Sequence, residues 1–330
     1  GLASGVSEVK VAIRKQEGSD YYYWSVLESS WVLGGLTPVE VNFNTTTLAG
    51  GVWWINISSP IWQDGKQYRI YARAKDKTDT GNLSNIVYND FIFDISSPTA
   101  RITTLIHEGV YSSLTQITGT SVDPVGVGGN AGLLDKVQVH IERPAQGGYP
   151  LRYWYVVESR WDASQPKEAE IYWGTTTIHL HNVSASSWTF TNLPSASDWT
   201  HNFIYIIRCR AKDQALPVGN TQHIFIVAES SFTIIWDNQP PIVSITSYED
   251  PDDNGKVNPG SDAWLIQGQA VDTPAGIPNV ANIRLKLLRL EGETSYYWTG
   301  TAWTTNEAEF TPDSYISPNW DYTFTDLTQL

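Results

Sequence analysis

The chain has 330 residues, of which 41% are hydrophobic, so it is long enough for two or three domains with separate cores. Its 35 acidic and 21 basic residues give a formal net charge of −14, which argues against nucleic acid as a partner. No apolar run approaches the ~20 residues that a membrane-spanning helix needs, so no membrane span is expected.

The first predicted strand alternates apolar and polar residues through Val9, Val11 and Ile13. A period of two residues is typical of a strand with one buried face. The segment YYYWSVLESSW follows and contains Trp24 and Trp31. The segments WWINI, YRIYARAKDKTDTGN and FIFDISSPTARIT come next, and they too have the composition of strands joined by turns.

The same succession returns twice along the chain. Its second copy contains the alternating residues and the two tryptophans at Val137, Val139, Ile141, Trp154 and Trp161. Its third copy contains them at Ile283, Leu285, Leu287, Trp298 and Trp303. The related segments ITGTSVD and IQGQAVD precede the second and third copies. Because an active site normally occurs once per chain, these recurring features indicate scaffold, and we predict a tandem array.

Short strands separated by Gly, Pro, Asn and Asp predict an all-β fold of tandem immunoglobulin-like sandwiches. We expect residues 1–96 to form a partial repeat without its first two strands. Residues 97–239 should form a complete repeat, and residues 240–330 a partial repeat without its last two strands. The partial repeats fit a segment of a longer array, which we favour, or subunits completed by strands from their neighbours.

The motifs occur in a fixed order: Ile-x-Gly-x-x-x-Asp, the alternating strand, the Tyr-Trp hairpin with its second Trp, then Ala-x-Asp with Gly-Asn. Over essentially the whole chain, this order resembles bacterial immunoglobulin-like and fibronectin-III-like tandem repeats. Such repeats belong to large prokaryotic cell-surface or extracellular filament proteins. The resemblance implies an extracellular or cell-surface location and a structural, adhesive or filament-forming role, although sandwich folds host many activities.

The tryptophans have two interpretations. Exposed aromatic rings could stack on sugars, but recurrence favours a structural hairpin with aromatic pairs across its strands. The six recurring positions are Trp24, Trp31, Trp154, Trp161, Trp298 and Trp303. Trp173, Trp236 and Trp264 do not recur and are candidates for subunit interfaces, where tryptophan is enriched.

The segment DPDDNGKVN resembles the start of a calcium-binding loop. Its candidate ligands are Asp250, Asp252 and Asn254, followed by Asp262, although Ser261 stands where the loop pattern has glutamate. The alternative is a solvated acidic turn. Asp76 and Asp213 end the two Ala-x-Asp strands, and each is interpreted as an aspartate that accepts hydrogen bonds from its own turn. The alternative is an ion shared with Asp79. No cofactor is required, and calcium is the one candidate ion.

Four Asn-x-Ser/Thr sequons, at Asn44, Asn56, Asn82 and Asn182, are candidate glycosylation sites. The absence of Met and the start at Gly1 fit a processed or internal piece of a larger product. Cys209 is the only cysteine, which excludes a disulfide within the chain. It alternates with apolar residues, so we expect a small buried side chain and no nucleophile.

No Gly-rich phosphate loop and no nucleophile elbow is present, so we do not expect an enzyme. The function that we expect is that of a non-enzymatic extracellular structural protein, a repeat segment or subunit of a surface fibre, stalk or filament. Its expected partners are copies of itself or neighbouring repeats, together with glycans. The alternative is an adhesin or carbohydrate-binding segment of a larger secreted or surface protein.

Overall fold

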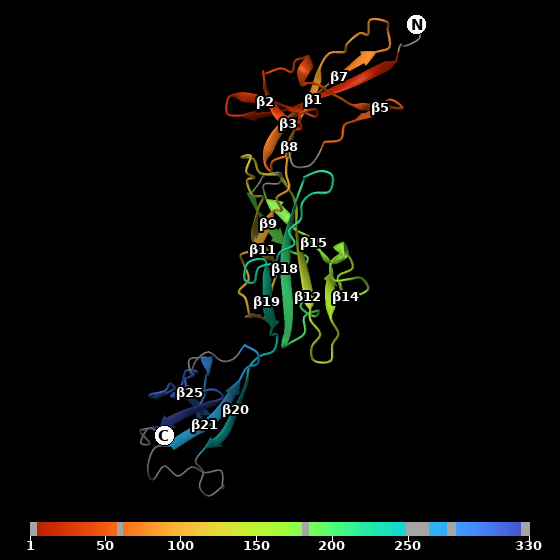
Figure 1. Cartoon of the computed structure of the whole chain (residues 1–330). Coiled ribbons are helices and arrows are strands. Elements are labelled where there is room, and N and C mark those ends of the chain that lie inside the picture. The colour runs from red at the N-terminus through yellow and green to blue at the C-terminus, as the bar shows by residue number, and fades with distance from the viewer. Residues whose placement is uncertain (1–4, 58–61, 180–184, 249–263, 276–281, 325–330) are drawn as a thin grey trace.

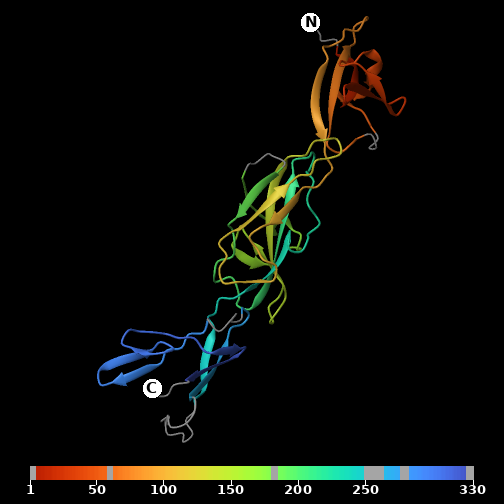
Figure 2. The same ribbon diagram turned by 90° about the vertical axis from the view of Figure 1, so that its left-hand side faces the viewer.

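The computed structural model describes residues 5–57, 62–179, 185–248, 264–275 and 282–324. These residues form mostly antiparallel sheets joined by turns, with short 3-10 turns as the helical elements. The predicted all-β sandwich class is therefore confirmed. The sheets fall into an N-terminal, a middle and a C-terminal region, which follow one another along an elongated molecule (Figures 1 and 2).

The strands are numbered in chain order. The N-terminal region contains β1 (Val6–Glu17), β2 (Asp20–Ser25), β3 (Ser30–Gly34), β4 (Asn44–Thr45), β5 (Thr47–Ala49), β6 (Val52–Trp54), β7 (Lys66–Asp76) and β8 (Val87–Phe93). The middle region contains β9 (Thr99–Ile102), β10 (Gly109–Tyr111), β11 (Ile117–Val122), β12 (Leu134–Arg143), β13 (Arg152–Tyr155), β14 (Arg160–Asp162), β15 (Gly174–Thr175), β16 (Thr177–His179), β17 (Ala185–Phe190), β18 (Phe203–Asp213) and β19 (Ser231–Trp236). The C-terminal region contains β20 (Ile242–Tyr248), β21 (Trp264–Val271), β22 (Leu288–Glu291), β23 (Thr294–Trp298), β24 (Trp303–Thr304), β25 (Ser314–Ile316) and β26 (Asn319–Phe324).

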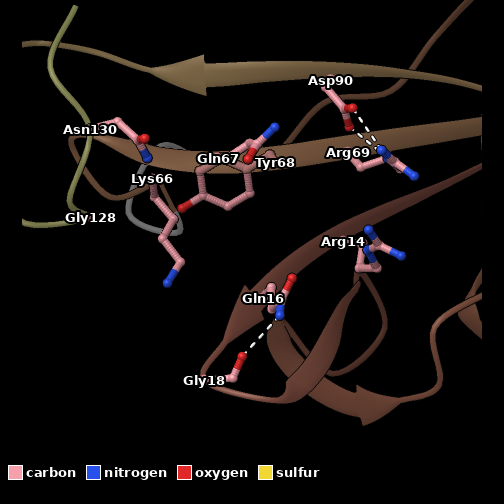
Figure 3. Close-up of a pocket in the computed structure, with 10 residues that line it drawn as sticks. All are labelled: Arg14, Gln16, Gly18, Lys66, Gln67, Tyr68, Arg69, Asp90, Gly128 and Asn130. Atoms are coloured by element: carbon pink, nitrogen blue, oxygen red, sulfur yellow. Dashed lines mark hydrogen bonds and ion pairs between the residues drawn. The ribbon is translucent and has the colours of Figure 1, made fainter.

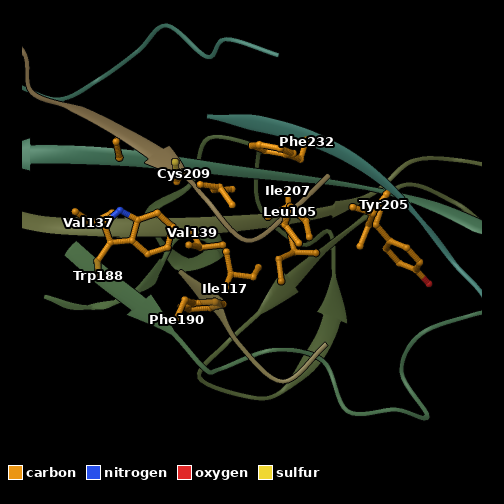
Figure 4. Packing of buried hydrophobic residues seen from close by; sticks show 14 of the residues in the cluster. Leu105, Ile117, Val137, Val139, Trp188, Phe190, Tyr205, Ile207, Cys209 and Phe232 are labelled. Atoms are coloured by element: carbon orange, nitrogen blue, oxygen red, sulfur yellow. The ribbon is translucent and has the colours of Figure 1, made fainter. Parts of the chain in front are cut away.

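The middle region is a sandwich of two sheets. One has the strand order β10-β19-β18-β12-β13-β14, with β15 added beside β12, and the other has the order β16-β17-β11-β9. Their facing side chains form one core, in which Trp188 and Phe190 lie opposite residues of β12 and β18 (Figure 4). Val137, Val139 and Ile141 are at most 1% exposed, which confirms the strand predicted from their alternation. Cys209 is fully buried in this core, as expected.

The Ile-x-Gly motif has a steric explanation. Gly119 of β11 pairs with Trp188 of β17, and the indole ring lies across the glycine. A Cβ atom on Gly119 would lie 2.3 Å from Cζ2 of Trp188 and 2.0 Å from the carbonyl oxygen of Arg101. Gly268 stands in the same relation to Trp320, at 2.2 Å. Glycine therefore makes room for a tryptophan on the neighbouring strand in both regions.

We expect Gly119→Ala to lower the free energy of unfolding by about 1–3 kcal/mol, because the new methyl group must displace either Trp188 or backbone. Urea unfolding followed by tryptophan fluorescence measures this change. The matched control is Gly35→Ala, since a Cβ there would meet nothing closer than 3.9 Å. Equal stability of the two variants would contradict the steric explanation.

The N-terminal region has one large sheet, of order β3-β2-β1-β7-β8 with β4 beside β1. Its second layer among the described residues is the two-stranded hairpin β5–β6. Buried Val11, Ile13, Trp24 and Tyr68 form the main core cluster of this region. The long strands β1 and β7 pair over most of their length, as β12 and β18 do in the middle region.

The C-terminal region corrects one expectation. Ile283, Leu285 and Leu287 were expected to lie on a regular strand, but Leu285 makes only an isolated bridge to Phe310, and β22 begins at Leu288. In the other regions the corresponding run pairs with a long strand, β7 or β18. The described part of the C-terminal region provides no strand of that kind beside this run, which explains the difference.

An insertion after the tryptophan hairpin covers the outer face of the large sheet. It contains the turn η1 (Glu40–Asn42) in the N-terminal region and η3 (Glu170–Tyr172) in the middle region. Glu40 pairs with Lys10 and Arg73, and Glu170 pairs with Lys136 and Arg210. Each insertion is thus fixed to the sheet by one carboxylate held between two cations.

Candidate functional site

The three tryptophan hairpins have the same geometry. Trp24 pairs directly with Trp31, Trp154 with Trp161, and Trp298 with Trp303. The ring centroids of each pair lie 5.5 Å apart, at interplanar angles of 68°, 65° and 61°. The first tryptophan of each pair is buried, and the second packs against it. These six rings are therefore part of the packing of each region.

A cation covers the second ring of every pair. Lys15, Arg143 and Arg289 lie 4.9, 5.3 and 4.7 Å from the centroids of Trp31, Trp161 and Trp303. These three cations were not predicted, although the sequence contains a signal for them. In each copy a basic residue stands two positions after the last apolar residue of the alternating run, as Lys15 does after Ile13. Residues two apart in a strand face the same side.

We expect Arg143→Gln to destabilise the chain by about 0.5–2 kcal/mol, because the cation–π contact with Trp161 is lost. Arg143→Lys should recover most of this loss, since lysine already fills the position at Lys15. Thermal unfolding followed by fluorescence measures both variants. Arg152→Gln, on the neighbouring strand of the same hairpin, controls for loss of charge, and an equal effect there would contradict the prediction.

Two tryptophans expected at subunit interfaces are instead inside the chain. Trp173 is stacked between Phe225 and the guanidinium of Arg210, and it is 5% exposed. Trp236 is stacked on Trp199 and is 2% exposed. The expectation was wrong for both, because the ring of Trp236 lies in the core of the middle region and the ring of Trp173 is buried under the insertion on the outer face of its large sheet. The side chain of Trp264 lies outside the described residues.

The predicted calcium loop lies outside the described residues, with Asp250, Asp252, Asn254 and Asp262, and so does the sequon at Asn182. Asn44 donates its amide to the backbone oxygens of Trp24 and Val11, so a glycan there would require those bonds to break. Asn82 and Asn56 are both exposed, but the side-chain amide of Asn82 donates a hydrogen bond to Asp76. Of these three sequons, Asn56 has the most accessible position.

Three aspartates that are far apart in the sequence meet at one end of the middle region. Asp94 follows β8, Asp123 follows β11, and Asp213 ends β18. One carboxylate oxygen from each lies within 4.8 Å of the other two. This end of the middle region faces the N-terminal region, so the cluster lies at the junction between them (Figure 1).

Asp213 has the role expected of it and also belongs to this cluster. Its Oδ1 accepts hydrogen bonds from the backbone of Ala215 and Asn220, and its Oδ2 accepts one from the Asn220 amide. Asp76 is held in the same way by Thr78 and Asn82. Asp76 has no such acidic neighbours within the described residues, so the two loops differ in their surroundings.

Asp123 is the most unusual member of the cluster. Its side chain is 1% exposed, and neither carboxylate oxygen has a hydrogen-bond partner. Burial, reinforced by the charges of Asp94 and Asp213, raises the pKa of Asp123 to about 7. Burial and the charge of Asp213 also raise the pKa of Asp94. A buried carboxylate without a partner destabilises the fold unless it is neutralised by a proton or a cation.

Gly132 closes one side of the cluster. A Cβ atom there would lie 2.0 Å from Oδ2 of Asp94 and 2.4 Å from Oδ2 of Asp123. Two carboxylate oxygens without partners therefore converge on the same glycine backbone. The position must remain glycine for the two oxygens to approach each other in this way.

Backbone hydrogen bonds fix the junction around the cluster. The loop 124–132 donates from the backbone of Gly128 to the oxygen of Asp64, at 2.7 Å. The side chain of Asn130 donates to the oxygen of Gly65, also at 2.7 Å. The Asp64 carboxylate accepts from the backbone of Ile95 in the linker. Asp64 is thus a fourth carboxylate next to the cluster, and its charge acts on Asp123.

A polar cleft of about 390 Å³ opens beside this junction (Figure 3). Arg14, Lys66 and Arg69 line it together with Asp90. Arg69 and Asp90 neutralise each other through two hydrogen bonds of 2.6 and 2.7 Å, and Arg14 is bonded to the carbonyl of Leu36. Since two of the three cations are already engaged, the cleft is a weak candidate for anion binding.

No protein-family model and no curated protein sequence matches this chain. In the part of the chain that the structure describes, none of the helical elements has the length or apolar character to cross a membrane.

Proposed function

We propose that the chain is a non-enzymatic structural protein of the cell exterior, a repeat segment or subunit of a fibre, stalk or filament. The observation that carries the proposal is the serial arrangement of the three regions, each with the same tryptophan pair and a lysine or arginine over its second ring (Figure 2). Features that recur in every region support a scaffold role better than a single reactive site. The succession of immunoglobulin-like motifs in the sequence supports the same class.

Two buried ionisable groups of the middle region support a role without catalysis. Cys209 is fully buried, and burial raises the pKa of its thiol, so a nucleophilic thiolate is disfavoured. Burial lowers the pKa of His140 to about 3, and the ring is packed between Tyr153 and Trp173. Both groups serve the packing of the middle region.

Immunoelectron microscopy of the cells that produce the protein tests the proposal. Antibodies raised against the 330-residue chain should label intact, unpermeabilised cells along fibres, stalks or a surface layer. Preimmune serum is the control. Labelling that requires permeabilised cells would place the protein inside and overturn the proposal.

A specific observation favours the alternative, carbohydrate binding. Trp53 and Trp54 on the hairpin β5–β6 are 39% and 44% exposed, next to exposed Val52. Exposed indole rings can stack on sugars. Titration with oligosaccharides, followed by tryptophan fluorescence, should give a saturable change that is lost in Trp53→Ala and Trp54→Ala. A change that persists in both variants would exclude this hairpin as the binding surface.

A further inference from the structure

We propose that Asp94, Asp123 and Asp213 bind a calcium ion at the junction between the N-terminal and middle regions. The ion would bind between β8, β11 and β18, where one oxygen from each carboxylate already lies within 4.8 Å of the others. None of these three aspartates belongs to the segment DPDDNGKVN. Calcium would hold the linker residue Asp94 against two strand ends of the middle region.

The burial of the Asp123 carboxylate without a hydrogen-bond partner is the observation that points to a ligand. This side chain is almost completely buried, yet both of its oxygens lack partners, and the charged groups that act on it are Asp94, Asp213 and Asp64. Its nearest carboxylates increase the electrostatic cost of its own charge. A cation bound among these oxygens would neutralise the group and supply the missing contacts.

The donor set favours calcium among the common ions. All three ligands are carboxylates, the hard oxygen donors that Ca²⁺ and Mg²⁺ prefer over the nitrogen and sulfur donors typical of zinc. Ca²⁺ accepts six to eight oxygens in irregular arrangements, whereas Mg²⁺ requires near-octahedral geometry and retains several waters. Carboxylates from three separate strand ends form an irregular set.

The junction between the middle and C-terminal regions provides a natural comparison. Asp237 follows β19 as Asp94 follows β8, and each aspartate accepts a backbone hydrogen bond from two residues further on. At the second junction the backbone N–H of Asn202 donates to the carbonyl oxygen of Trp236. At the first, the backbone N–H of Gly65 donates in the same way to the carbonyl oxygen of Phe93.

The two junctions differ in the residue that precedes the backbone donor. Asp64 precedes Gly65 at the first junction, and His201 precedes Asn202 at the second. The Nδ1 atom of His201 lies 3.2 Å from Oδ1 of Asp237. The second junction therefore has a histidine beside the aspartate that corresponds to Asp94, whereas the first junction has a further carboxylate, Asp64, in that place.

Isothermal titration of the whole chain, stripped with EDTA, with CaCl₂ at pH 7.5 tests the site. The wild type should bind one more calcium ion than Asp123→Asn, or bind it with an affinity at least about tenfold higher, since loss of even an outer partner of a metal ligand has effects of that size. Asp94→Asn should show the same loss. Near-UV circular dichroism checks that both variants are folded. If Asp123→Asn is unfolded, calcium binding by Asp94→Asn decides the result.

Two matched variants separate this site from its neighbours. Asp272→Asn changes the aspartate that corresponds to Asp123 at the second junction, and Asp252→Asn changes the acidic loop. Both should retain the ion that Asp123→Asn loses. Equal calcium binding by wild type and Asp123→Asn, or no binding by the wild type, would overturn the proposal and leave protons as the neutralising partner. The ion would bind whether or not the chain forms a fibre, so immunoelectron microscopy and titration can fail separately.

Discussion

Replacing Trp154 with alanine should lower the free energy of unfolding by about 3–5 kcal/mol, the range found when a large buried aromatic ring is removed. Trp154 is 2% exposed and packs edge-on against Trp161. Its indole nitrogen also donates to the carbonyl of Asn192, at 3.0 Å, so the substitution removes a hydrogen bond as well as a ring. Equilibrium unfolding in urea, with an unchanged slope against denaturant, measures the loss.

Trp53→Ala is the control, because that ring is 39% exposed and its removal should change stability by less than about 1 kcal/mol. Trp161→Ala should have an intermediate effect, since its ring is partly buried between Trp154 and Tyr205. Similar losses from Trp53 and Trp154 would mean that the hairpin rings are not the packing elements that their geometry indicates.

The regular part of the fold could be predicted because it depends on local patterns. Alternation along the chain marked Val11, Ile13, Val137 and Val139 as one buried face, and they are at most 1% exposed. Alternation alone failed at Leu285, because a strand also needs a neighbour to pair with, and pairing depends on segments far away in the sequence. The burial of Trp173 was missed for a similar reason, since an insertion places it over the outer face of the sheet.

The acidic cluster could not be predicted from any one motif. Each of its aspartates was visible in a recurring segment, Asp94 in FIFDISSP, Asp123 in ITGTSVD and Asp213 in the Ala-x-Asp strand. Their convergence depends on which strand ends point toward the same junction, which is a property of topology. Composition draws attention to DPDDNGKVN, because that segment concentrates its acidic residues locally, whereas the cluster gathers its aspartates from three elements.

Without calcium, wild-type stability should fall relative to Asp123→Asn as the pH rises from about 4 to about 8. The folded chain holds the pKa of Asp123 at about 7, above its ordinary value of 3.8, so the folded state binds the proton more tightly than the unfolded state. The stability that comes from this protonated group is fully present below pH 4 and is lost as the pH rises through about 7. The asparagine variant has no group to titrate there, so its difference from the wild type isolates this effect from other carboxylates.

Between pH 4 and pH 8 in EDTA, the wild type should lose about 2–4 kcal/mol of stability relative to Asp123→Asn, since each unit of pKa displacement corresponds to about 1.4 kcal/mol. Calcium should oppose this loss, because a cation binds the ionised carboxylates and stabilises the folded wild type by mass action. Thermal unfolding of both proteins at pH 4, 6 and 8, with EDTA or with CaCl₂, gives the full set of comparisons. A loss of wild-type stability at high pH that calcium reverses identifies a cluster neutralised by a metal ion. If the wild type loses stability with rising pH in both buffers, the cluster is neutralised by protons, and the folded chain is then most stable in acid.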